Sequence, residues 1–227
     1  MRNLVTHRGF RSDTTTETRY VKPQPSGDFW EDRYRACDGY LYGEAPNRFL
    51  ASKASLLRRG MKALTLADGD GRNGVWLAEQ GLDVLAVDRA PTALATSLAL
   101  AASRGVEIRT ECSDLGQWAF PRGTMDLVVS IFAHFGPDLR RHIHRAIVRA
   151  LKPGGQVILQ GFHTDQLQFD SGGPPSEEML FTAGRLREDF AELDIDELTE
   201  YRETLDEGLI HQGPAALVGM VAVRARL

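Results

Sequence analysis

Several stretches of the sequence are apolar at nearly every position instead of at alternate positions. Leu85–Val87, Leu127–Phe132 and Val157–Leu159 are the clearest examples, and such runs are typical of strands covered on both faces in a parallel sheet. Amphipathic segments with helical spacing separate these runs. The pattern predicts strands over residues 61–67, 83–88, 106–110, 125–132 and 156–162, and helices over 28–36, 46–59, 71–80, 91–104 and 137–151.

The last third of the chain has a different order of elements. Residues 193–205 and 215–224 are predicted to be strands joined directly by a turn segment over 206–214, so we expect them to pair antiparallel at one edge of the sheet. The predicted fold is α/β: a doubly wound, Rossmann-like, mostly parallel seven-stranded sheet with an antiparallel edge hairpin and N-terminal cap helices.

We expect one domain over residues 27–227, preceded by a flexible tail over residues 1–26. Within that domain we predict cap helices over 27–60, a cofactor-binding core over 61–162 and a substrate cap loop over 163–181. A helix and the edge hairpin are predicted for 182–227.

Composition narrows the class of protein. The 227 residues are 42% apolar and 26% charged, with 27 basic and 31 acidic side chains for a formal charge of −4. A globular core is therefore expected, without the excess of positive charge that a nucleic-acid partner requires. No apolar run approaches the roughly 20 residues that cross a bilayer. Cys37 and Cys112 are expected to be packing residues in a reducing compartment, and we predict a cytoplasmic location.

A glycine-rich segment follows the first predicted strand and opens a helix. Residues 68–74 read DGDGRNG, a G-x-G-x-x-G pattern that brings backbone N–H groups close to a ligand at a helix N-terminus. Asp88 ends the next strand, where a carboxylate can accept hydrogen bonds from both ribose hydroxyls. Asp68 and Asp70 would repel a diphosphate and would suit a cationic donor. A nicotinamide nucleotide and S-adenosylmethionine both stay open on this pattern alone.

Further motifs favour S-adenosylmethionine as the cofactor. They are WEDRY (30–34), YLYG (40–43), PNRFL (46–50), ADGDGRN (67–73), VWLA (75–78), DVLAVD (83–88), CSDL (112–115) and LKPGG (151–155). With these motifs the chain resembles the class I S-adenosylmethionine-dependent methyltransferases, in particular a bacterial small-molecule branch with tellurite- and thiol-methylating members. It departs from the family's loop, because Thr65 and Ala67 stand where an acid and a glycine are usual.

The resemblance implies that S-adenosyl-L-methionine is the cofactor and S-adenosyl-L-homocysteine the product. Asp68 is added from its charge, as a substitute for the missing acid at Thr65. The cofactor-binding residues expected are Arg33, Tyr34, Tyr42, Asp68, Gly69, Gly71, Asn73, Asp88, Arg89, Asp114, Leu115 and Ser130. No metal site is expected.

His134 and His211 are the predicted catalytic bases, because each follows a strand at the expected ligand-binding edge and imidazole titrates near neutral pH. His142 and His144 lie on the flank of the helix predicted over 137–151 and are expected to be solvated. The sequence does not identify the acceptor or the atom that is methylated.

The function expected is methyl transfer to a small-molecule acceptor, with no nucleic-acid or membrane partner and a monomeric or homodimeric state. Methylation of a macromolecule, a non-catalytic adenosyl-ligand binder and a nicotinamide-dependent reductase stay open as alternatives.

Overall fold

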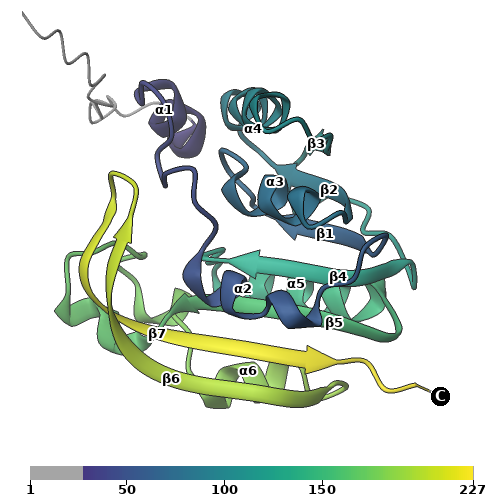
Figure 1. Cartoon of the computed structure of the whole chain (residues 1–227). Coiled ribbons are helices and arrows are strands. Elements are labelled where there is room, and N and C mark those ends of the chain that lie inside the picture. Colours follow the sequence, from purple (N-terminus) through teal and green to yellow (C-terminus); the bar gives the residue numbers. More distant parts are fainter. Residues whose placement is uncertain (1–27, 227) are drawn as a thin grey trace, which may run out of the picture.

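The computed structural model describes residues 28–226 and contains one seven-stranded sheet of order β3-β2-β1-β4-β5-β7-β6 (Figure 1). β1 to β5 run parallel, while β7 is antiparallel to both β5 and β6. The strands are β1 (Lys62–Leu66), β2 (Asp83–Asp88), β3 (Arg109–Cys112), β4 (Met125–Ile131), β5 (Leu151–Phe162), β6 (Asp194–Glu207) and β7 (His211–Val223). The predicted α/β fold class is confirmed.

The helices cover both faces of this sheet. They are α1 (Phe29–Arg35), α2 (Arg48–Ser52), α3 (Arg72–Glu79), α4 (Pro91–Ser103), α5 (Pro137–Ala150) and α6 (Ala183–Asp189), with 3-10 turns η1 (Ala54–Leu56), η2 (Thr164–Gln168) and η3 (Glu177–Met179). Val128 packs in one apolar core with Ile143 of α5 and Leu186 of α6. Its neighbour Leu127 faces the other core, with Leu50 and the helices on that side. The continuously apolar β4 is thus buried on both faces, as expected.

The prediction of one helix over residues 46–59 is wrong, because α2 is shorter and ends at Ser52. Asn47 caps α2, because its side-chain oxygen accepts the Leu50 N–H at 3.0 Å. At the end of this five-residue helix the hydroxyl of Ser52 donates to the Phe49 carbonyl at 2.7 Å, and α2 gives way to η1. Serine side chains compete in this way with the backbone hydrogen bonds of a helix.

The strand predicted over 106–110 lies later in the chain, at β3. Gly105 adopts a φ of 67° after α4, and the Val106 N–H donates to the Ala101 carbonyl at 3.0 Å. This bond pattern closes the C-terminus of a helix, so residues 106–108 belong to the connection.

The C-terminal hairpin is longer than predicted. β6 and β7 pair from Asp194–Val223 to Glu207–His211, which leaves residues 208–210 as the turn instead of 206–214. The hairpin curves away from the sheet, and its tip reaches the segment between α1 and α2 (Figure 1). There the Leu209 N–H donates to the Leu41 carbonyl at 2.9 Å. Two segments far apart in the sequence therefore meet beside the glycine loop.

The tail expected over residues 1–26 lies outside the described residues. Within residues 28–226, no helix has the length and apolar character needed to cross a bilayer.

Candidate active site

A cavity of about 320 Å³ lies at the carboxyl ends of the central parallel strands. Its walls come from α1, the segment before α2, the loops after β1 to β4, and η3. Ten of the fourteen predicted site residues line it: Tyr34, Tyr42, Asp68, Gly69, Asn73, Asp88, Arg89, Asp114, Leu115 and His134. The other four, Arg33, Gly71, Ser130 and His211, are not part of the lining.

Gly69 sits where the loop passes closest to α1. Its φ is 61°, and a Cβ at this position would lie 2.2 Å from the Tyr34 hydroxyl oxygen. The Gly69 N–H donates to Asp88 Oδ2 at 2.9 Å, so the loop is fixed to the end of β2. Only glycine allows this approach without displacing Tyr34.

Gly71 has a different role from the one predicted. With a φ of 90°, it packs against α4, and a Cβ there would lie 2.2 Å from the Ser97 hydroxyl oxygen. Close packing of the loop on a neighbouring helix explains this glycine, and Gly71 does not line the cavity.

Three carboxylates, those of Asp68, Asp70 and Asp88, line one end of the cavity. Burial, then the charge of Asp88, raises the pKa of Asp68 to about 7. Burial raises the pKa of Asp70 to about 6 and that of Asp88 above its usual range. Because negative charges crowd this buried end, a cation is favoured there and a diphosphate is not.

Asp70 presents an unused acceptor in this region. Its Oδ2 atom accepts the N–H groups of Leu41 at 2.7 Å and Tyr42 at 3.3 Å. Its Oδ1 atom is buried and has no hydrogen-bond partner among the described residues. A buried acceptor without a partner is unfavourable, and a ligand N–H group would supply one.

Asp88 is oriented by the backbone. Its Oδ2 accepts from Gly69 and its Oδ1 accepts from the Ala90 N–H, both at 2.9 Å. Each carboxylate oxygen has a second lone pair, so both can still accept from a pair of hydroxyls. Asp114 and Leu115 line the next part of the wall, where Asp114 Oδ1 also accepts the Gly116 N–H at 2.8 Å.

Other parts of the cavity lining are apolar and aromatic. Phe132, Phe135 and Leu139 contribute from the segment after β4, and Met179 contributes from η3. These residues were not predicted individually. Phe132 could be found only as a residue leaving β4, and Met179 only as part of the irregular segment over 163–181.

His134 lines the cavity, but neither of its ring nitrogens is available. Nε2 accepts the Phe162 N–H at 3.0 Å, so Nδ1 carries the proton and lies 2.9 Å from the Met179 carbonyl oxygen. Burial lowers the pKa of this imidazole to about 4. The geometry contradicts the predicted role of His134 as a general base, because its only lone pair is already occupied.

His211 lies outside the cavity, behind two aromatic rings. Its ring centroid is 4.6 Å from that of Phe132 and 4.8 Å from that of Tyr42. The side chain is 5% exposed, and burial lowers the pKa of His211. The two rings stand between this imidazole and the cavity, so the prediction of His211 as a base also disagrees with the structure.

Two other predicted residues, Ser130 and Arg33, are not part of the lining. Ser130 is buried within β4, and the Arg33 guanidinium lies 5.2 Å from the ring centroid of Phe29 and 5.8 Å from that of Trp30. The expectation that His144 is solvated is wrong: it is 1% exposed, and its Nδ1 lies 2.8 Å from Asp189 Oδ2. Cys112 is exposed, contrary to its predicted packing role.

Comparison with known proteins finds a methyltransferase domain in this chain. Residues 63–155, which contain the glycine loop and Asp88, match the family described as "Methyltransferase domain". The curated 2-heptyl-1-hydroxyquinolin-4(1H)-one methyltransferase of Mycobacteroides abscessus is 26% identical over 164 residues, which cover 65% of this chain and 69% of that protein. This match and this relative support a class I S-adenosylmethionine-dependent methyltransferase.

Solved structures agree with this methyltransferase at the level of the fold. TehB from Haemophilus influenzae has a TM-score of 0.63 at 20% identity, over 77% of this chain and 61% of that one. A structure concerned with the conversion of a disulfide bond into a thioacetal group during echinomycin biosynthesis has a TM-score of 0.68 at 21% identity, over 83% and 86% of the two chains.

The residues of this methyltransferase fit a sulfonium cofactor. The carboxylate-lined end, the unused Asp70 Oδ1 and the close approach at Gly69 suit a cationic ligand with an amino group and a ribose. Ala67 stands at the family's glycine position and has a φ of 49°, so the loop keeps a glycine-like backbone. Thr65 stands at the family's acid position beside Asp68, and its hydroxyl counters the rise in the pKa of that carboxyl.

Proposed function

We propose that this methyltransferase transfers a methyl group from S-adenosylmethionine to a small, apolar acceptor whose reactive atom is already a nucleophile when it binds. The observation that carries this proposal is the mixed lining of the cavity. Three buried carboxylates lie close together in it, much of the rest is aromatic or aliphatic, and its one imidazole, His134, has no free nitrogen to act as a base.

At the cofactor end, Asp88 would accept hydrogen bonds from the ribose hydroxyls. Asp70 Oδ1 would take up the methionine ammonium, with Asp68 adding negative charge nearby. Asp114 and Leu115 would hold the adenine by its amino group and its face. The bound cofactor supplies a methyl group on a sulfonium, and the protein has to align the acceptor in line with that bond and exclude water.

For the acceptor, Phe132, Phe135 and Met179 offer apolar area and no charge. A cavity of about 320 Å³ suits small molecules. The relative from Mycobacteroides abscessus is named for an alkylated hydroxyquinolone, a flat heteroaromatic compound. That name and this apolar wall together support an aromatic acceptor.

The acceptor atom must reach its nucleophilic form without help from an imidazole. His134 has both nitrogens in hydrogen bonds, and His211 lies behind Phe132 and Tyr42. Acids with a pKa near or below neutrality, such as N-hydroxy heteroarenes and aromatic thiols, meet this requirement. Their anions attack the methyl group directly, so no proton is moved during the displacement.

Titration calorimetry with S-adenosylmethionine, S-adenosylhomocysteine and NADH tests the cofactor, and we expect only the first two to bind. Release of S-adenosylhomocysteine is then measured with an N-hydroxyquinolone, a thiophenol, a simple phenol and an alkylamine. Turnover is expected with the first two acceptors. Binding of NADH alone would contradict the proposed cofactor, and preference for the alkylamine would contradict the proposed acceptor class.

A further inference from the structure

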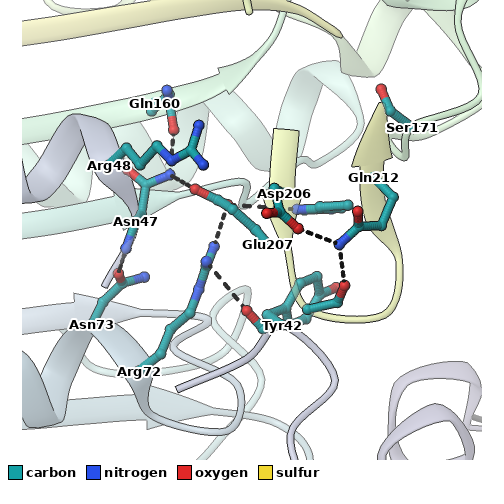
Figure 2. Close-up of polar contacts among 12 residues, drawn as sticks. Tyr42, Asn47, Arg48, Arg72, Asn73, Gln160, Ser171, Asp206, Glu207 and Gln212 are labelled. Atoms are coloured by element: carbon teal, nitrogen blue, oxygen red, sulfur yellow. Dashed lines mark hydrogen bonds and ion pairs between the residues drawn. The ribbon is translucent and has the colours of Figure 1, made fainter. Parts of the chain in front are cut away.

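A buried polar cluster joins the tip of the β6–β7 hairpin to the glycine loop and to α2 (Figure 2). Glu207, the last residue of β6, is at its centre. Its Oε2 lies 2.8 Å from Arg72 Nη2, and its Oε1 accepts from Asn47 Nδ2 at 3.0 Å. The side chains of Glu207 and Arg72 are each 5% exposed. Both oxygens of this carboxylate therefore have partners from other elements.

The partners of Glu207 surround Tyr42, which lines the cavity. The Arg72 guanidinium lies 5.7 Å from the Tyr42 ring centroid, and one of its nitrogens donates to the Tyr42 carbonyl at 3.4 Å. The His211 ring packs edge-on against the same tyrosine at 4.8 Å. His211 Nδ1 is 4.0 Å from Glu207 Oε2. One carboxylate thus binds Arg72 and lies beside His211, and these are the two groups that flank the tyrosine.

The charge of Glu207 is permanent at any working pH. Burial would raise the pKa of this carboxyl, but His211 and Arg72 outweigh burial and lower the pKa to about 2. Buried ion pairs contribute little net stability compared with apolar packing, because desolvation offsets their attraction. Stability alone is therefore a weak reason for this pair to be here, and placement of its neighbours is a better one.

The backbone of the same segment is fixed from two sides. Gly208, with a φ of 67°, packs so closely that a Cβ there would lie 2.3 Å from the Tyr42 carbonyl carbon. On the other side, Asp70 accepts the N–H groups of Leu41 and Tyr42. The tyrosine is thus held between the hairpin tip and the glycine loop.

We propose that Glu207 is a positioning residue that holds the Tyr42 ring against the cofactor end of the cavity, acting through Arg72 and His211. The hairpin tip, which lies far in sequence from the parallel core of the sheet, thereby sets cofactor affinity. This inference rests on the proposed function, because it takes the cavity to be the site of S-adenosylmethionine.

The test compares Glu207→Gln with Glu203→Gln by calorimetric titration of S-adenosylhomocysteine. Glu203 lies on the same strand and pairs with Arg48 at 3.3 Å near the surface, so it controls for loss of a β6 carboxylate. We expect E207Q to raise the dissociation constant roughly tenfold, and E203Q to leave it within about twofold. With an acceptor in hand, E207Q should raise the KM for S-adenosylmethionine more than it lowers kcat.

A double-mutant cycle with Tyr42→Leu separates positioning from a general structural role. If Glu207 acts through the tyrosine, E207Q should weaken binding much less in the Y42L background, although it lowers the melting temperature in both backgrounds. Should E207Q not fold, Glu207→Asp keeps the charge and is measured in the same cycle.

Unchanged affinity in E207Q, or an equal loss with and without Tyr42, would overturn the positioning role while leaving the proposed function intact. Failure of the wild-type protein to bind S-adenosylhomocysteine would instead overturn the proposed function.

Discussion

Gly69 and Tyr34 are in such close contact that adding one methyl group at Gly69 should lower the stability of the protein measurably. Gly69→Ala should destabilise the protein by about 2–4 kcal/mol, because the left-handed backbone alone costs about 1–2 kcal/mol for an L-residue and the Tyr34 hydroxyl must also move. Cofactor affinity should fall with it, since Tyr34 lines the cavity. Chemical denaturation and calorimetric titration measure the two effects.

Gly60 supplies the matched control for this substitution. It has a φ of 82° and open space where a Cβ would lie, so Gly60→Ala should show only the backbone effect, about 1–2 kcal/mol. Adding Tyr34→Phe to the Gly69→Ala protein should restore part of the stability, because the nearest remaining ring atom is 3.2 Å away. Equal losses in the two alanine variants would show that the contact with Tyr34 is unimportant.

Asp68 and Asp70 make cofactor affinity depend on pH. Their pKa values, about 7 and about 6 in the ligand-free protein, lie above those of an unfolded chain, so the stability of the free protein should fall as pH rises from about 4 to 7. A cationic ligand binds the ionised carboxylates and releases their protons. The affinity for S-adenosylmethionine should therefore rise roughly 10- to 100-fold between pH 5.5 and 8.

Calorimetry at the two pH values, in buffers of different ionisation enthalpy, measures both the affinity and the released protons. S-adenosylhomocysteine, which lacks the sulfonium charge, should show a smaller dependence. An affinity for S-adenosylmethionine that is the same at both pH values would contradict the electrostatic role of these acids.

The strands are easier to predict from the sequence than the contacts between the elements. The apolar runs of β4 and β5 are local properties, and so is the glycine at the end of α4. The roles of His134 and His211 are set by partners 28 to 45 residues away or by rings of other elements, which no local pattern contains. The prediction that His144 is solvated fails for the same reason, since its partner Asp189 belongs to α6 and is distant in sequence.

His134 joins three elements, since it follows β4 and bonds β5 and η3. Its pKa of about 4 in the folded protein is below the value of about 6.5 for an unfolded chain. The unfolded state therefore binds the proton more readily, and stability should fall as pH drops from 6.5 to 4. Glutamine does not titrate, so the stability of the His134→Gln protein should fall by about 2 kcal/mol less than that of the wild type over this pH range.

Denaturant unfolding at pH 7 and at pH 4.5 measures the difference. His142→Gln is the control, because His142 is exposed on the same α5 helix as the buried His144. A pH dependence of stability in the H134Q protein equal to that of the wild type would contradict the hydrogen-bonded role of this imidazole.

Across the whole molecule, the cavity is closed by parts of the chain that the parallel core does not contain. Tyr34 and Tyr42 come from before β1, Met179 comes from η3, and the hairpin tip supports the tyrosine segment at Leu41. The family match over residues 63–155 covers none of these parts. The glycine loop and Asp88 are therefore predictable from a local sequence motif. The contacts that close the cavity depend instead on how distant segments of the chain pack together.

Because the parallel core and the segments that close the cavity are separate parts of the chain, ligand binding should stabilise both and should order the closing segments. S-adenosylhomocysteine at about 100 times its dissociation constant should stabilise the native state by about 2.7 kcal/mol, and ordering of the closing segments should accompany binding. Hydrogen exchange should slow together at residues 40–43 and at 208–210, because the Leu209–Leu41 hydrogen bond links the two segments. Amides of β6 near Asp194, at the far end of the hairpin, serve as an internal control and should change less. Slowing at the glycine loop alone would mean that the hairpin tip takes no part in enclosing the cofactor, and that the core binds it unaided.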